Sequence, residues 1–145
     1  MIALLQRASW AQVTIDGEVS ARIDKGLLVL LGIEREDTEA KADKLLHKIL
    51  NYRVFADEQG RMNLSLLDIN AELLLVSQFT LAATTDKGMR PGFSSAMAPN
   101  EAEALYDYML AEARQSPVRV QAGSFGADMK VALENDGPVT FTLRV

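Results

Sequence analysis

The chain has 145 residues, of which 48% are hydrophobic and 24% are charged, and its formal net charge at pH 7 is −5. These values are typical of one globular domain, residues 1–145, and the absence of cysteine excludes disulfides and thiolate sites. The acidic balance argues against a protein that coats nucleic acid broadly through a basic face, but it leaves room for recognition of one RNA end in a small pocket.

The N-terminal half contains several β-rich segments and one amphipathic helical pattern. Strands are expected at residues 1–7, 11–15, 18–23, 26–33 and 52–55, with a hairpin turn at Asp16-Gly17. Segment 26–33 is apolar throughout, which predicts a strand buried on both faces. Residues 38–50 predict a helix with Asp37 or Thr38 as its N-cap, whereas residues 64–69 are ambiguous.

The C-terminal half begins with a second strongly apolar strand, expected at residues 72–81, whose polar residues cluster at its C-terminal end. A loop without periodicity follows over residues 82–95, and Pro99 opens a helix that runs to about Ala113. Further strands are expected at residues 118–121, 129–133 and 139–145. The stretch Asn135-Asp136-Gly137-Pro138 lies between the last two strands and predicts a turn that connects them.

These elements predict an α/β domain that has more sheet than helix, with about eight strands and two main helices. Two helices cannot cover both faces of so many strands. We therefore expect two β layers packed on each other, with the helices on one side.

Other features of the sequence bear on location and chemistry. No apolar run is long enough to cross a bilayer and the first residues lack the features of a signal peptide, so the expected location is the cytoplasm. The single histidine, His47, falls on the polar side of the first predicted helix and is expected to be solvated. With one histidine, a Ser-His-Asp triad and a multi-histidine metal site are both excluded as predictions.

Three stretches carry side chains suited to chemistry, and each has a purely structural alternative. Residues 77–80 bring two hydroxyls and an amide to a strand end, which suits an oxyanion site, although no base for either hydroxyl lies nearby in the sequence. Lys87 and Arg90 lie near glycines and suit phosphate contacts, unless that loop is merely solvated. Residues 123–129 are glycine-rich, and Phe125 suits stacking on a base, unless its ring lies in the core.

Two of these stretches carry a resemblance to a known family. Ser77-Gln78-Phe79-Thr80-Leu81, together with Asn135-Asp136-Gly137-Pro138-Val139-Thr140, resembles the two motifs of the D-aminoacyl-tRNA deacylases, the D-tyrosyl-tRNA deacylase family. Further stretches also resemble it: Gln6-Arg7-Ala8, residues 26–32, Met62-Asn63-Leu64-Ser65, Lys87-Gly88-Met89-Arg90-Pro91 and Phe125-Gly126-Ala127-Asp128-Met129. The resemblance covers essentially the whole chain. Its small departures are Gly92, where serine is expected, and Trp10, an unusual aromatic near the first hairpin.

The resemblance implies a sheet-rich three-layer β/β/α sandwich, with a barrel-like β core and two main helices, that forms a homodimer. It implies a cytoplasmic ester hydrolase that needs no metal or other cofactor, binds the aminoacylated 3′ end of tRNA, and has no DNA or membrane partner. The reaction that the resemblance implies is hydrolysis of D-aminoacyl-tRNA, and of glycyl-tRNA mischarged on tRNA(Ala), to free amino acid and tRNA. The implied role is proofreading that enforces homochirality in translation.

The resemblance also assigns roles to particular residues. It implies a catalytic wall of Ser77, Gln78, Phe79 and Thr80, and cross-subunit chiral selection by Gly137, Pro138, Arg7 and Asn135. We add the hypotheses that Phe125, Ala127 and Met129 form a site for the terminal adenine and that Lys87 and Arg90 contact phosphates. A cis Gly137-Pro138 bond is expected to reach into the partner subunit's pocket, held by Arg7. Its carbonyl oxygens would bind the α-amino group and fill the space of an L side chain, whatever that side chain is.

The mechanism and the function class both have alternatives at this point. Thr80 is one candidate nucleophile; the other mechanism uses water activated with help from the ribose 2′-hydroxyl, and an oxyanion bound by backbone N–H groups near Phe79 and Thr80. A plain esterase or peptidase for small D-amino esters is a second function, and a non-catalytic protein that protects the tRNA end is a third.

Overall fold

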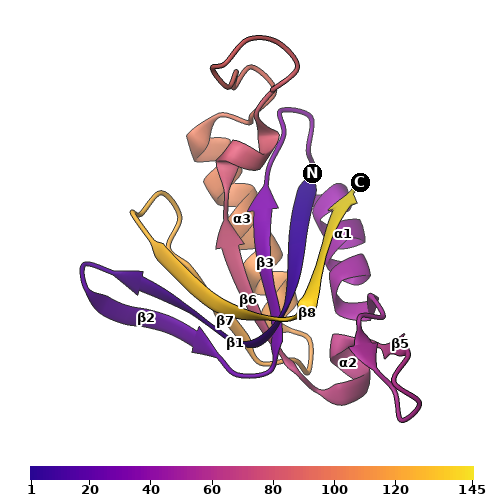
Figure 1. The fold of residues 1–145 in the computed structure, drawn as a ribbon. Coiled ribbons are helices and arrows are strands. Elements are labelled where there is room, and N and C mark those ends of the chain that lie inside the picture. Colours follow the sequence, from indigo (N-terminus) through magenta and orange to yellow (C-terminus); the bar gives the residue numbers. More distant parts are fainter.

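Two long antiparallel strands, β1 (Ile2–Ile15) and β8 (Lys130–Arg144), run side by side along the fold in the computed structural model, which describes residues 1–145 (Figure 1). The other elements are β2 (Glu18–Ile23), β3 (Gly26–Gly32), α1 (Glu39–Asn51), β4 (Phe55–Ala56), β5 (Met62–Leu64), α2 (Leu66–Ile69), β6 (Glu72–Ser77), the 3-10 turn η1 (Phe79–Ala82), α3 (Pro99–Arg114) and β7 (Val120–Ala122). No helix is long and apolar enough to cross a membrane.

Six of the strands form one strongly bent sheet in the order β2-β1-β3-β6-β7, with β8 on β1. The N-terminal half of β1 lies between β3 and β8, and its C-terminal half lies between β2 and β8. Strands β3, β6 and β7 pair in parallel. Because β1 takes part in both halves, the two expected β layers are two parts of one continuous sheet.

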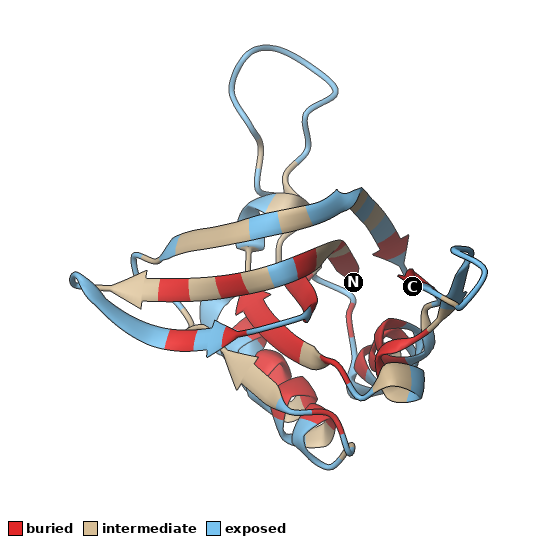
Figure 2. Cartoon of the chain, turned by 60° about the horizontal axis from the view of Figure 1, so that its bottom comes forward, coloured by how far each residue is buried: buried red, intermediate tan, exposed pale blue.

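Two hydrophobic clusters separate three layers. The larger one packs α1 and α3 against the sheet, for example Ile49 and Met109 against the layer that contains Leu75. The smaller one lies on the opposite face of β3 and β6, where β2 and the end of β1 cover residues such as Val76. The buried residues gather between these layers in Figure 2. The expected fold class, a mixed α/β arrangement with a barrel-like sheet and two main helices, is confirmed.

The sequence pattern explains why β3 and α1 form where they do. Alternate residues of β3 enter different clusters, Leu27 and Val29 the larger one and Leu28 the smaller one, so the predicted burial of this strand on both faces is confirmed. The side chain of Thr38 accepts a hydrogen bond from the backbone N–H of Lys41, which makes Thr38 the N-cap of α1. His47 is exposed, as its place in the helical pattern predicts.

Several predicted boundaries are wrong. Residues 1–7 and 11–15 belong to one strand, because β1 exchanges its partner from β3 to β2 without a break. The strand predicted at 52–55 is observed only at residues 55–56. For residues 64–69 the sequence was ambiguous, and the structure divides them between the end of β5 and α2. The strand predicted at 72–81 ends at Ser77, where the 3-10 turn replaces it.

The predicted turn at residues 135–138 is also wrong, and its error concerns the site. Both halves of β8 pair with β1 in the same antiparallel sense, so the chain does not reverse here. Gln6 pairs with Thr140 and Ala8 with Asn135, which leaves residues 136–139 without register partners. The stretch is therefore a bulge in a continuous strand, because one strand of the pair has extra residues.

Candidate functional site

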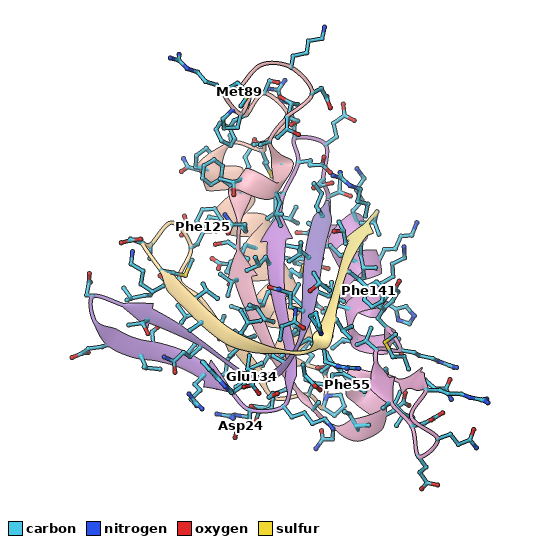
Figure 3. The ribbon with its side chains drawn as sticks, in the orientation of Figure 1. Asp24, Phe55, Met89, Phe125, Glu134 and Phe141 are labelled. Atoms are coloured by element: carbon cyan, nitrogen blue, oxygen red, sulfur yellow. The ribbon has the colours of Figure 1, made fainter.

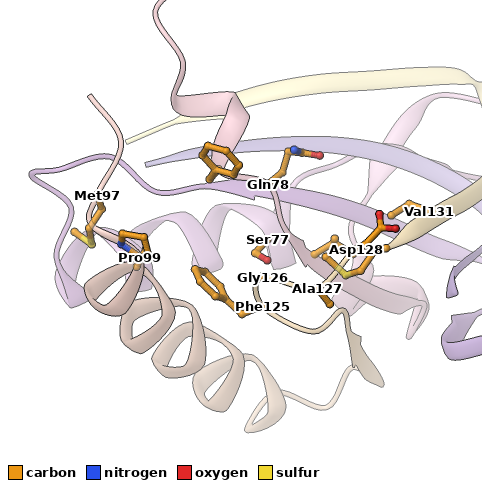
Figure 4. A pocket seen from close by; sticks show the side chains of 13 residues that line it. Ser77, Gln78, Met97, Pro99, Phe125, Gly126, Ala127, Asp128 and Val131 are labelled. Carbon is orange, nitrogen blue, oxygen red and sulfur yellow. The ribbon is translucent and has the colours of Figure 1, made fainter. Parts of the chain in front are cut away.

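A cavity of about 470 Å³ opens where β6 ends, between the first turn of α3 and the loop that connects β7 to β8 (Figure 4). Its lining residues are Val76, Ser77, Gln78, Phe79, Met97, Pro99, Ala102, Phe125, Gly126, Ala127, Asp128, Met129 and Val131. The cavity therefore unites two stretches that the sequence analysis selected separately, residues 77–79 and residues 125–129. Most of its wall is apolar, and its polar groups come mainly from the strand end.

The strand end gives the cavity its polar groups. The backbone N–H of Gln78 donates to the Leu31 carbonyl at 2.7 Å, after which the chain enters the 3-10 turn. The N–H of Leu81 returns to the Gln78 carbonyl at 3.1 Å. The N–H groups of Phe79 and Thr80 precede the first hydrogen bond of that turn, so the turn itself offers them no acceptor.

Thr80 lies beside the cavity without lining it. The side-chain amide of Gln78 donates a hydrogen bond to the Thr80 hydroxyl oxygen at 2.6 Å, and Thr80 is exposed. In this hydrogen bond the Thr80 hydroxyl oxygen is the acceptor, so Gln78 does not take the hydroxyl proton of Thr80. A nucleophilic hydroxyl needs a neighbouring base that accepts its proton, and the hydrogen bonds of Thr80 include none.

Tyr106 of α3 links β6 to the loop after β7, which carry the two walls of the cavity. Its hydroxyl donates to the carbonyl of Leu75 at 2.9 Å and approaches the carbonyl of Gly123 at 3.2 Å. Its ring packs against Phe125, with 5.9 Å between the ring centroids. Burial, with the nearby Asp107 carboxylate, raises the pKa of Tyr106 well above its usual value, so the hydroxyl is protonated and can donate at neutral pH.

The loop after β7 has a shape that depends on small residues. A side chain on Gly123 would place its Cβ 2.7 Å from the Met129 sulfur, so any larger residue here would displace the Met129 side chain from its present position. Gly126 has a φ of +72°, which favours glycine in this turn. Further along, the Lys130 ammonium pairs with the exposed carboxylate of Asp128 at 2.9 Å, on the solvent side of the cavity.

Lys87 and Arg90 lie outside the cavity, on a loop that projects from the fold with Met89 fully exposed (Figure 3). Two backbone hydrogen bonds close this loop at its base: the N–H of Thr84 donates to Gly92 at 2.8 Å, and the N–H of Gly92 donates to Thr84 at 3.0 Å. The two cations therefore lie on a projecting loop that follows the strand end in the chain, and neither lines the cavity.

The bulge in β8 is held by two side chains. Arg7 donates from Nε to the Asp136 carbonyl at 2.9 Å and from Nη1 to the Val54 carbonyl at 2.6 Å. Asn135 accepts from the Val139 N–H at 2.8 Å. The Gly137–Pro138 bond is cis, and both residues are exposed.

This bulge is distant from the cavity of its own chain. Ser77 pairs with Leu31 of β3, whereas Arg7 pairs with Leu27. These four residues of strand correspond to about 13 Å along the sheet. Neither Gly137 nor any other residue of the bulge lines the cavity.

The remaining polar features are structural. A second cavity is lined only by polar residues, among them Glu34 and Asp37, and these two carboxylates bind the Met1 ammonium at 3.0 and 2.7 Å. No group of three or more His, Cys, Asp or Glu side chains is placed to hold a metal ion.

Sequence reasoning did not find the α3 side of the cavity. Met97, Pro99 and Ala102 line it, and Tyr106 supports it, yet in the sequence these residues only indicate the start and the apolar face of a helix. No local pattern distinguishes them from ordinary core residues. Only the packing of α3 beside the end of β6 brings them to the site.

Comparison with known proteins gives consistent results along the whole chain. The model of the family described as D-Tyr-tRNA(Tyr) deacylase matches residues 4–144. The D-aminoacyl-tRNA deacylase of Stutzerimonas stutzeri (strain A1501) is 63% identical over 99% of both chains, and that of Aeromonas hydrophila subsp. hydrophila is 61% identical over 100% of both. A solved structure titled c-Myc DNA Unwinding Element Binding Protein superposes with a TM-score of 0.95 at 43% identity, covering 100% of this chain and 99% of that one.

The link through Tyr106 leads to a stability prediction. The Tyr106→Phe substitution removes the hydroxyl that reaches the Gly123 carbonyl, and we expect the free energy of unfolding to fall by about 1–2 kcal/mol in urea denaturation. Tyr108→Phe is the matched control, because its hydroxyl donates to Asp43 at the surface, and it should cause a smaller loss. Equal losses in the two variants would show that the Tyr106 hydroxyl does not hold the cavity walls together.

Proposed function

The chain belongs to the D-Tyr-tRNA(Tyr) deacylase family and has D-aminoacyl-tRNA deacylase activity, and we propose that the cavity at the end of β6 is where the ester is hydrolysed. The observation that carries this proposal is the junction of residues 77–79 with residues 125–129 around one cavity. The first stretch offers polar backbone and side-chain groups, and the second offers an apolar wall with an aromatic ring. An aminoacylated nucleoside needs both environments.

The reaction that fits this wall is attack of water on the ester carbonyl. The water oxygen bonds to the carbonyl carbon and gives up a proton, while the negative charge develops on the carbonyl oxygen. The bond to the ribose oxygen then breaks, and that oxygen takes up a proton, so the products are the free amino acid and the tRNA. The N–H groups of Phe79 and Thr80 are suited to bind the oxyanion, which contributes about 3–4 kcal/mol per donor in known enzymes. Ser77 and Gln78 shape the same wall.

Thr80 is poorly suited to act as the nucleophile. Its hydroxyl accepts a hydrogen bond from Gln78 and has no base to take its proton. We therefore assign activation of the water to the substrate, whose ribose 2′-hydroxyl lies next to the ester. In this mechanism the protein supplies position and oxyanion stabilisation and requires no metal.

The apolar wall is suited to the terminal base of the substrate. Phe125, Ala127 and Met129 come from one loop and form a surface on which an adenine ring fits, with Tyr106 behind Phe125. Lys87 and Arg90 would meet phosphates of the RNA outside the cavity. The net charge of −5 predicts few phosphate contacts in total, and hence a shallow salt dependence of binding.

Chiral selection requires groups that test the α-carbon without regard to the side chain. We assign this role to the carbonyl oxygens of Gly137 and Pro138, which would bind the α-amino group and fill the space of an L side chain. Their bulge has no register partners, is exposed, and is held in place by Arg7 and Asn135. Glycine has no side chain to exclude, so glycyl-tRNA mischarged on tRNA(Ala) is a second expected substrate.

The location of the bulge favours a homodimer. Since residues 136–139 are distant from the cavity of their own chain, they can take part in selection only in the cavity of another copy. A twofold dimer that exchanges these bulges completes two sites at once. We propose that this dimer proofreads aminoacyl-tRNA in the cytoplasm.

A direct assay separates this proposal from a small-ester hydrolase and from a protein that only protects the tRNA end. With chelator present, we expect rapid hydrolysis of D-aminoacyl-tRNA and no comparable hydrolysis of the L counterpart. A small-ester hydrolase would cleave D-amino methyl esters as rapidly as the tRNA ester, and a protecting protein would slow the loss of the ester. Inactivation by chelator would contradict the metal-independent mechanism.

The role of Thr80 can be tested by single substitution. For Thr80→Ala we expect turnover of D-aminoacyl-tRNA within about tenfold of the unmodified protein, because the backbone N–H remains and the hydroxyl is not the nucleophile. A fall of several orders of magnitude would identify Thr80 as the nucleophile. As a complementary arm, a substrate with a 2′-deoxy terminal ribose should be hydrolysed much more slowly, and an unchanged rate would count against assistance by the RNA.

A further inference from the structure

Two large aromatic side chains stay exposed beside the proposed catalytic wall. Phe79 is 60% exposed and Phe93 is 40% exposed, although both are large apolar residues. Their rings lie 5.0 Å apart between centroids, with 43° between the planes. They form a small continuous apolar surface on the outside of the fold, and neither hydrolysis nor chiral selection uses it.

We propose that the Phe79–Phe93 pair is a stacking platform for the base that precedes the terminal nucleotide of the RNA. This inference rests on the proposed function, because it assumes that the terminal nucleoside occupies the cavity. Exposed aromatic rings are the usual contact for unpaired bases, and stacking on them needs no particular base sequence. The single-stranded 3′ end of the substrate is the partner that offers such a base at this point.

The platform is continuous with the cavity. Phe79 lines the cavity with residues 125–129 and also packs against Phe93 outside it. An RNA strand whose last nucleoside lies in the cavity can leave it along this wall, past Phe79. The next base along the strand then meets the outer aromatic surface before the strand reaches solvent.

The backbone around Phe93 is fixed well enough to present its ring. The paired hydrogen bonds between Thr84 and Gly92 precede it, and the Ala96 N–H donates to the Phe93 carbonyl at 3.1 Å. The Ser95 carbonyl accepts from the N–H of Arg35 at 2.9 Å, which ties the segment to the end of β3. A Cβ on Gly92 would lie 2.5 Å from the Thr84 hydroxyl oxygen, so this tight closure depends on glycine.

Charge supports RNA as the partner of this surface. The loop that Thr84 and Gly92 close contains Lys87 and Arg90 with one carboxylate, Asp86, and so carries a net positive charge on an acidic protein. An RNA strand that crosses the aromatic pair toward this loop would bring its phosphates to these cations.

Two substrates that differ by one nucleotide test the platform. One is the D-aminoacyl ester of adenosine, and the other is the same ester on a dinucleotide that ends in adenosine. We expect Phe93→Ala to lower the ratio of kcat/KM for the dinucleotide to that for the mononucleoside about tenfold, mainly through KM. Phe93→Tyr, which keeps the ring, should restore the ratio. Val19→Ala, an exposed apolar residue on β2, is the matched control and should not change it.

The alternative outcomes are distinct. An unchanged ratio in Phe93→Ala would overturn the platform and leave the proposed function intact. A change in oligomeric state of Phe93→Ala, seen by sedimentation, together with an unchanged ratio, would assign the aromatic pair to a subunit contact. Failure of the unmodified protein to hydrolyse either ester would contradict the occupancy of the cavity by the terminal nucleoside, and with it the proposed function.

Discussion

The pairing of β1 with β8 is the constraint on which the rest of the structure depends. β1 belongs to both β layers, and β8 follows it along both halves. This long ladder fixes where extra residues of β8 must leave the sheet, between the partners of Gln6 and Ala8. The guanidinium of Arg7 lies on β1 at this break and binds the Asp136 carbonyl. The strand that organises the core therefore also presents the exposed bulge at 136–139.

The cavity arises because the pairing between β6 and β7 is short. β7 pairs with β6 over only three residues, so the chain leaves the sheet after Ala122 while β6 continues to Ser77. The space between the two strand ends is bounded by α3, and the Tyr106 hydroxyl bonds to both strands at the point where they part. The proposed catalytic and base-binding walls are thus adjacent although they are far apart in the sequence. The proposed oxyanion stabilisation requires backbone N–H groups that are held in place in this way.

The elements with a regular hydrophobic pattern could be predicted from the sequence. The way in which these elements meet could mostly not be predicted. Residues 26–33 and 38–50 were identified because burial on both faces and helical amphipathicity leave clear patterns. Residues 135–138 were predicted as a turn because Asn, Asp, Gly and Pro are typical both of turns and of bulges. Only the continuous pairing of β8 with β1 shows that the chain forms a bulge, at residues 136–139. Ser77 to Phe79 and Phe125 to Met129 were selected from motifs, whereas Met97 and Ala102 had no pattern beyond that of a helix. Contacts between elements that are distant in the sequence therefore determine the bulge and the α3 side of the cavity, which local sequence patterns could not predict.

We propose that each site is built from the cavity of one subunit and the bulge of another. Mixed dimers test this most directly, using one chain with the cavity filled by Ala127→Trp and a second chain with the bulge altered by Gly137→Ala and Pro138→Ala. Each variant alone should lose D-selective hydrolysis. After the two are unfolded and refolded together in equal amounts, we expect recovery to about a quarter of the activity of the unmodified protein, since about half of the dimers are mixed and each contains one complete site. A mixture no more active or selective than the average of the separate variants would contradict it.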